Sequence, residues 1–153
     1  YNIMTVFHSR DQWEPNASKR VEPTGENIPV MIAEKDEALA MARKLRDMIA
    51  AASPGVNHNV KTYLEFVAEG FPAYIEGFRL ELISTVYTKK AEISQDPGDV
   101  QKARETLAGY EELASRYDSL VRNKGYSHVV EYMLDGDRLI RFKADVSRVL
   151  DAI

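Results

Sequence analysis

The sequence has no cysteine among its 153 residues. Disulfide bonds, thiolate metal sites and a cysteine nucleophile are therefore excluded. A strong excess of one charge sign is also lacking. The chain has 24 Asp and Glu residues and 20 Lys and Arg residues, and no concentrated basic run occurs. Proteins that bind nucleic acids or anionic membranes usually depend on such a run. Neither is expected as a partner.

Long apolar runs are missing as well. No stretch approaches the roughly 18 consecutive apolar residues of a membrane span, and the first residues lack the profile of a signal peptide. Membrane insertion is therefore not predicted. The apolar content of 44% still suffices for the core of one soluble domain. Because the chain begins at Tyr1 rather than Met, we expect a processed chain or a piece of a longer protein.

The signatures of common catalytic sites are absent too. The sequence has no G-x-G-x-x-G, no phosphate loop and no G-x-S-x-G motif. His8, His58 and His128 show neither the Glu-x-x-His nor the His-x-x-x-His spacing that sets two metal ligands on one helical face. Neither a metal nor a cofactor is predicted, and catalysis by this chain alone is not expected.

The first 30 residues have no regular pattern. Pro15, Pro23, Gly25 and Pro29 interrupt them, so residues 1–30 are predicted to be an irregular segment or linker. From about Ala33 onward, apolar residues recur at steps of three and four, which is typical of amphipathic helices. Residues 31–153 are therefore predicted to form a helical bundle domain.

The first helix is predicted to run from about Ala33 to the SPG sequence at residues 53–55. Its buried face is expected to comprise Ala38, Met41, Ala42, Leu45, Met48, Ile49 and Ala52.

The second helix is predicted from about Asn59 to Ile93, with Pro72 inside it. Apolar residues on both sides of Pro72 share one helical phase, which favours a single kinked helix. Proline cannot donate a hydrogen bond to the carbonyl one turn back, so the bend is expected at residues 68–72. The alternative is a helix that stops at Gly70, with Pro72 in the first turn of a new helix.

The DPGD sequence at residues 96–99 is a helix start signal, with Asp96 as N-cap and Pro97 in the first helical position. This third helix is predicted to end at Gly125, and a fourth to open near Ser127. The buried rows of the third helix are expected to comprise Val100, Ala103, Leu107, Tyr110, Ala114, Tyr117 and Val121. The fold class is therefore all-α, an up-and-down antiparallel bundle of three to four long helices.

The second helix also holds the candidate site. Six of the 14 aromatic residues of the chain lie between Tyr63 and Tyr87. Core packing requires such residues at this spacing, while a ligand cleft at the bend or a contact with another domain is the alternative. The candidate ligand-binding residues are Tyr63, Phe66, Glu69, Phe71, Tyr74, Glu76 and Phe78.

Glu65, Glu69 and Glu76 share a helical face beside Pro72. Paired carboxylates can perform acid and base chemistry when burial separates their pKa values. The same spacing is typical of the solvated face of an amphipathic helix, and no nucleophile or histidine accompanies it. An enzyme that uses this face is a third hypothesis, and it requires at least two of these glutamates to be buried together.

Four segments carry a resemblance over the latter two-thirds of the chain. They are YLEFVAEGFPAYIEGFRLEL, the DPGD start, ARETLAGYEELASRYDSLV and DGDRLIRFKADVSRVL. In their long helices rich in Tyr, Leu and Arg, they resemble the helical accessory domains of large multidomain bacterial glycoside hydrolases. The resemblance implies a non-catalytic domain that packs against a catalytic neighbour, shapes its cleft or mediates dimerisation. It would also imply a secreted or periplasmic location, and it assigns no catalytic residue to this chain.

The sequence thus predicts a structural or interaction domain whose partner is a neighbouring domain of the same polypeptide or a second copy of the chain. A small-ligand-binding or sensor bundle with its site at the Pro72 bend is the alternative.

Overall fold

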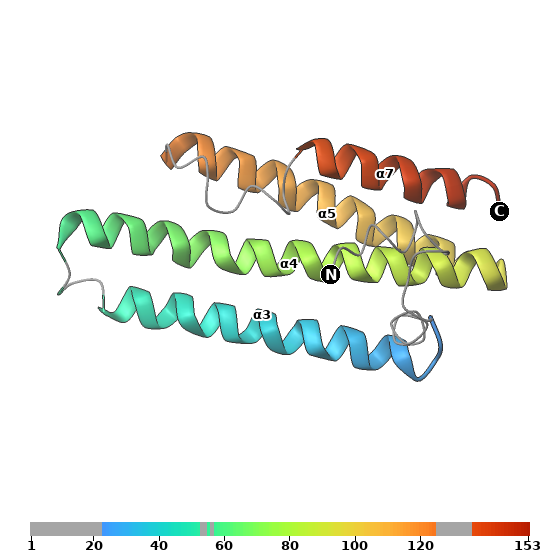
Figure 1. Cartoon of the computed structure of the whole chain (residues 1–153), viewed down its shortest axis with the longest axis horizontal. Helices are drawn as coiled ribbons and strands as arrows, with labels where there is room; N and C mark the ends of the chain where they lie inside the picture. The colour runs from blue at the N-terminus through green and yellow to red at the C-terminus, as the bar shows by residue number, and fades with distance from the viewer. Residues whose placement is uncertain (1–22, 53–54, 56, 125–135) are drawn as a thin grey trace, which may run out of the picture.

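The computed structural model describes residues 23–52, 55, 57–124 and 136–153. These residues form helices α3 (Asn27–Ala52), α4 (His58–Ser94), α5 (Pro97–Lys124) and α7 (Gly136–Leu150), with no strand among them. Successive helices run in opposite directions (Figure 1), so the predicted all-α, up-and-down antiparallel bundle is confirmed. The expectations for residues 1–22, for the helix start near Ser127, and for His8 and His128 lie outside the described residues.

Helix α4 is the central element of the bundle. In Figure 1, α3 lies along one side of α4, while α5 and α7 lie along the other. The most extensive packing joins α4 to α5 and α4 to α3, with smaller contacts between α7 and both α4 and α5. Since α3 packs mainly against one helix, much of its surface faces away from the rest of the bundle.

The larger core lies between α4, α5 and α7. Tyr110 of α5 and Phe142 of α7 are fully buried, and their rings meet edge to face with centroids 5.8 Å apart. The other buried members of this core are Phe66, Ala91, Ala103, Leu107, Leu113, Ala114, Tyr117, Val146 and Leu150. The rows predicted for α5 are confirmed, except that Val100 is only partly buried and the side chain of residue 121 lies outside the description.

A smaller core joins α3 to α4 through Ile28, Met31, Leu82 and Val86. Helix α3 also buries Leu39 and Ala42.

The predicted buried face of α3 is wrong for Met41, Leu45 and Met48, because these side chains are 61, 41 and 60% exposed. It is also wrong for Ala52, which is exposed at the end of the helix. Apolar residues occur on two faces of α3, and only one face can contact α4.

Helix α3 begins earlier than predicted. The Oγ1 of Thr24 accepts a hydrogen bond from the N–H of Asn27 (3.1 Å), and the Thr24 carbonyl accepts one from Ile28 (3.0 Å). Thr24 therefore caps the helix, and Pro29 is tolerated near this end with the loss of one backbone hydrogen bond. The predicted boundary between residues 30 and 31 falls inside α3.

Helix α4 continues through Pro72 over 37 residues. The prediction that it does not stop at Gly70 is confirmed. It ends at Ser94, where Gln95 adopts the left-handed conformation (φ 55°) and donates its N–H to the carbonyl of Ala91 (2.8 Å). With Pro97 opening α5, only two residues separate the helices.

The substitution Phe142→Ala should lower the free energy of unfolding by about 3–5 kcal/mol, because it removes a fully buried ring from the larger core. Ile140→Ala is the matched control on the same helix, since Ile140 is 67% exposed. It should change stability by less than about 0.5 kcal/mol. Chemical denaturation measures both, and equal effects would contradict the assignment of the core.

Pro72→Ala should raise the free energy of unfolding by about 1 kcal/mol. A proline inside a helix is roughly 3 kcal/mol less favourable than alanine, and its two additional methylenes contribute about 0.8 kcal/mol each when buried. Pro72 is buried within α4, so both effects apply and the first is larger. Urea unfolding tests this, and a marked loss of stability would mean that the proline supports a conformation that alanine cannot adopt.

Candidate functional site

The seven candidate site residues do not form one surface. Phe66 is buried in the larger core, whereas Tyr63 and Phe71 are exposed. Tyr74 and Phe78 are partly buried. The aromatic row divides in this way because α4 contacts α3 on one side and α5 with α7 on the other.

Three of the aromatic rings do contact one another along α4. The rings of Phe71 and Tyr74 are stacked with centroids 6.5 Å apart, and those of Tyr74 and Phe78 meet edge to face at 4.9 Å. Tyr74 also packs against the larger core. Neither of the two cavities described below is lined by an aromatic side chain. Of these three rings, Tyr74 thus packs into the bundle, while Phe71 is exposed beside it.

A cavity of about 340 Å³ lies between α3 and α4. It is lined by Arg46, Ile49, Ala50, Glu65, Ala68 and Glu69. Two of the three predicted carboxylates thus come together, but Glu69 is exposed and Glu65 is only partly buried. Two of the three charged groups also have a neighbour of opposite charge close in sequence: Arg46 pairs with Asp47 at 2.8 Å, and Lys61 Nζ lies 3.7 Å from Glu65 Oε1.

Glu76 is partly exposed and lies outside this cavity. The acid and base hypothesis requires two glutamates buried together, and the described structure does not supply that burial.

Metal ligands do not gather in the described part of the chain. No group of three or more His, Asp or Glu residues there is placed to hold a metal ion. His58 is exposed at the first residue of α4. Among the described helices, none combines the length and the apolar character needed to cross a membrane.

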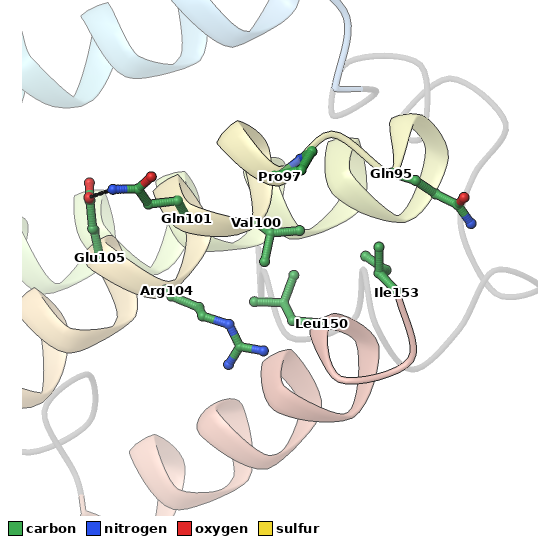
Figure 2. A pocket seen from close by; sticks show the side chains of 8 residues that line it. All are labelled: Gln95, Pro97, Val100, Gln101, Arg104, Glu105, Leu150 and Ile153. Atoms are coloured by element: carbon green, nitrogen blue, oxygen red, sulfur yellow. Dashed lines mark hydrogen bonds between the residues drawn. The ribbon is translucent and has the colours of Figure 1, made fainter.

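A larger cavity, of about 580 Å³, lies where the first turns of α5 meet the end of α7. Figure 2 shows Val100 of α5 and Leu150 of α7 pointing toward one another in it. Three of its polar side chains are already engaged, since Gln101 donates to Glu105 (2.8 Å) and Arg104 pairs with Asp151 (2.7 Å). The remaining lining is formed by Gln95, Pro97 and Ile153. An apolar floor with a polar rim could hold a small amphipathic molecule.

A buried polar row on α4 is the feature that the sequence analysis missed. Glu81, Ser84, Thr85 and Thr88 are buried, and their spacing of three and four residues places them on one helical face. The Ser84 hydroxyl donates to the carbonyl of Ala103 on α5 (3.3 Å). Thr85 and Thr88 donate to the carbonyls one turn back, at 2.8 and 2.7 Å. The hydroxyls are thus satisfied within the bundle.

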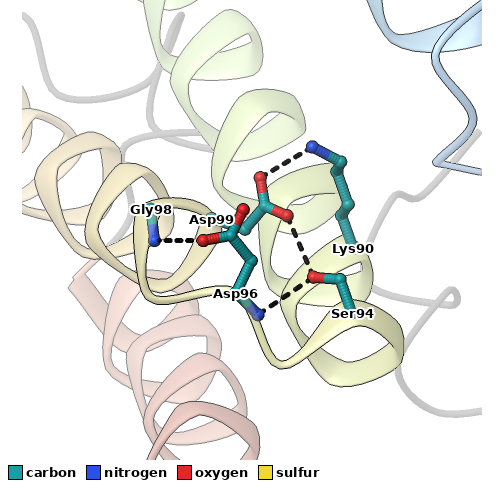
Figure 3. A network of polar contacts seen from close by, with 5 residues as sticks. All are labelled: Lys90, Ser94, Asp96, Gly98 and Asp99. Carbon is teal, nitrogen blue, oxygen red and sulfur yellow. Dashed lines mark hydrogen bonds and ion pairs between the residues drawn. The ribbon is translucent and has the colours of Figure 1, made fainter.

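The turn between α4 and α5 is closed by a polar network (Figure 3). Lys90 Nζ donates to Asp99 Oδ1 at 2.8 Å, and Ser94 Oγ donates to Asp99 Oδ2 at 3.0 Å. Ser94 Oγ also accepts from the N–H of Asp96 at 3.2 Å. Asp96 Oδ1 in turn accepts from the N–H of Gly98 at 2.8 Å. The predicted N-cap Asp96 and the predicted helix start at Pro97 are confirmed.

Electrostatics reinforce this network. The Asp99 side chain is only 7% exposed, and it lies in the first turn of α5, where a carboxylate complements the positive end of the helix dipole. The hydrogen bond to Asp99 raises the pKa of Lys90 above its ordinary value, and this effect exceeds the opposing effect of desolvation. Both Asp99 oxygens are engaged, so the cluster serves to hold the turn together.

An apolar row on the outer face of α3 was also missed as a surface. We call Val30, Met41, Leu45 and Met48 the α3 outer row. The exposed fractions are 58% for Val30, 61% for Met41, 41% for Leu45 and 60% for Met48. At about 100° per residue, steps of 11, 4 and 3 return to the same side of a helix. These four side chains therefore share one face, which points away from α4.

No protein-family model matches the sequence, and neither the curated proteins nor the solved structures contain a match to it.

A double-mutant cycle with Lys90→Met and Asp99→Asn should give a coupling below about 1 kcal/mol at neutral pH, because the lysine side chain is 40% exposed. The folded-state pKa of Lys90 lies above the ordinary value of 10.5. The coupling should therefore be complete below pH 10.5 and should decline as the pH rises through the folded-state pKa. Denaturant unfolding at neutral pH and above pH 10.5 measures the coupling. A coupling that grows above pH 10.5 would contradict the ion pair between Lys90 and Asp99.

Proposed function

We propose that this chain is a non-catalytic helical domain whose function is to contact another protein domain. The observation that supports the proposal is the α3 outer row, four large apolar side chains that share one face and remain exposed to water. Single exposed apolar residues are common on soluble proteins, whereas an aligned group is typical of an interaction surface. The contact surface of the domain is therefore the outer face of α3.

The contacts that the other candidate residues make in the structure support the same proposal. Phe66 is buried in the larger core, and the rings of Phe71, Tyr74 and Phe78 contact one another. The buried hydroxyls bond to backbone carbonyls, and the Asp99 carboxylate holds the turn. These groups stabilise the fold, so they are not available for chemistry on a substrate. Membership of a larger carbohydrate-active protein rests on the resemblance of the helical segments alone.

A small-ligand-binding bundle is the second candidate function. It is favoured by the cavity between α5 and α7, whose volume of about 580 Å³ lies within the range of small-molecule sites. The site of this second candidate is then near the C-terminal end of α4, rather than at the predicted bend around Pro72. The two functions separate cleanly, because ligand binding in this cavity does not depend on the outer face of α3.

Replacing Met41 and Met48 together by Glu should weaken binding to the partner domain at least tenfold while leaving the fold intact. Both side chains are exposed, so the free energy of unfolding should change by less than about 0.5 kcal/mol per substitution. Two measurements test the double variant: calorimetric titration against the segments that flank this chain in its gene, and calorimetric dilution of the chain itself. Each should show binding at least tenfold weaker than that of the wild type.

Ile93→Glu is the matched control, because Ile93 is 73% exposed but lies on α4. It should bind like the wild type. If neither a flanking segment nor a second copy of the chain binds the wild type at several hundred micromolar, the proposed function is wrong.

A further inference from the structure

We propose that the α3 outer row binds a second copy of this chain, with the two α3 helices packed antiparallel about a two-fold axis. The inference rests on the proposed function, and it names the partner.

The charge pattern of α3 favours self-association. The N-terminal half of the helix carries Glu34, Asp36 and Glu37 with one lysine, and the C-terminal half carries Arg43, Lys44 and Arg46 with one aspartate. Parallel pairing of two such helices would bring like charges together. Antiparallel pairing brings the acidic half of each copy against the basic half of the other. The sign pattern thus selects both the partner and its direction.

Part of this charge is used within the chain, and part is left for a partner. Asp36 pairs with Arg79 of α4, and Arg46 pairs with Asp47. Glu37 and Lys44 are exposed at four residues before and three residues after Met41, on the face of the outer row. In the part of the chain that the structure describes, neither of these two side chains takes part in an ion pair.

A two-fold axis beside Met41 brings these groups together. In an antiparallel pair, a residue three or four positions before the axis lies opposite a residue three or four positions after it. Glu37 of each copy then faces Lys44 of the other, so that the ion pair forms twice, once on each side of the axis. The two Met41 side chains meet at the centre, where the flexible thioether adapts to its own copy. Val30 of each copy lies opposite Ala51 and Ala52 of the other, at the ends of the interface. Between the centre and the ends, Leu45 and Met48 lie against the side-chain methylenes of Glu37 and Glu34.

The size of this surface sets the strength of the dimer. From Val30 to Met48, the outer row extends for about 27 Å at about 1.5 Å per residue. One helix face of this length offers less than the roughly 800 Å² per partner of a standard interface. We therefore expect a dimer with a dissociation constant in the micromolar range, and dissociation by added salt because the flanking ion pairs are exposed.

Charge reversal tests the arrangement. Glu37→Lys and Lys44→Glu should each weaken the dimer roughly tenfold in analytical ultracentrifugation at low salt, because each change converts two attractive contacts into repulsive ones. The double variant should regain an affinity within about threefold of the wild type, since the pair is restored in reverse. Lys102→Glu, an exposed change on α5, is the control and should leave the affinity unchanged.

Three outcomes would overturn the inference. The first is a wild type that stays monomeric at several hundred micromolar, and if a flanking domain then binds the outer row, the proposed function survives without the homodimer. The second is a dimer that tolerates Met41→Glu with Met48→Glu, because its interface would lie elsewhere. The third is a double charge reversal that fails to restore affinity, because Glu37 and Lys44 would then not face each other. Far-ultraviolet circular dichroism verifies that every variant is folded.

Discussion

The packing of α4 between α3 on one side and the pair of α5 and α7 on the other is the constraint on which the rest of the structure depends. Each side of α4 must supply its own set of contacts, and Tyr87 packs against both cores. Continuity through Pro72 is therefore important, because a break there would uncouple the first half of the helix from the second. The buried row of Ser and Thr hydroxyls fits the same constraint, since their bonds to carbonyls let polar residues lie inside a helix that is covered on several sides.

Much of this fold could be predicted from the sequence where local signals and packing agree. The buried rows of α5 follow from the spacing of residues such as Leu107 and Tyr110, and the start of the helix follows from the DPGD sequence. The continuity of α4 follows from the shared phase of its apolar residues. In each case, the local preference of the chain and the tertiary contact point to the same structure.

The prediction failed where the sequence allows two solutions. Helix α3 has apolar residues on two faces, and only its contact with α4 decides that Met31 and Leu39 are buried while Met41 and Met48 are not. The candidate aromatic residues divide for a similar reason. Phe66 and Phe71 are five residues apart, which is about 140° around the helix, so the first is buried in the core while the second is exposed. The polar row after Phe78 could have been noticed in the run STVYT, which departs from the apolar pattern of its surroundings.

These observations divide the molecule into a part that maintains the fold and a part that is available for contact. The larger core, the hydroxyl row and the turn network belong to the first part. The α3 outer row belongs to the second, and its exposure has a physical origin in the arrangement of the helices. A helix at the edge of a bundle that contacts a single neighbour can carry a second apolar face without loss of folding stability.

The short connection between α4 and α5 also affects how the chain can assemble. Because only Gln95 and Asp96 separate the two helices, the first contacts between them join residues that are close in sequence, and the closure of so short a loop loses little chain entropy. The backbone conformation of Gln95 and the hydrogen bonds of Asp96 fix the direction of the reversal locally. In the described chain, this turn is therefore the point where closing a loop costs the least chain entropy. Folding of the helical hairpin of α4 and α5 is expected to begin there.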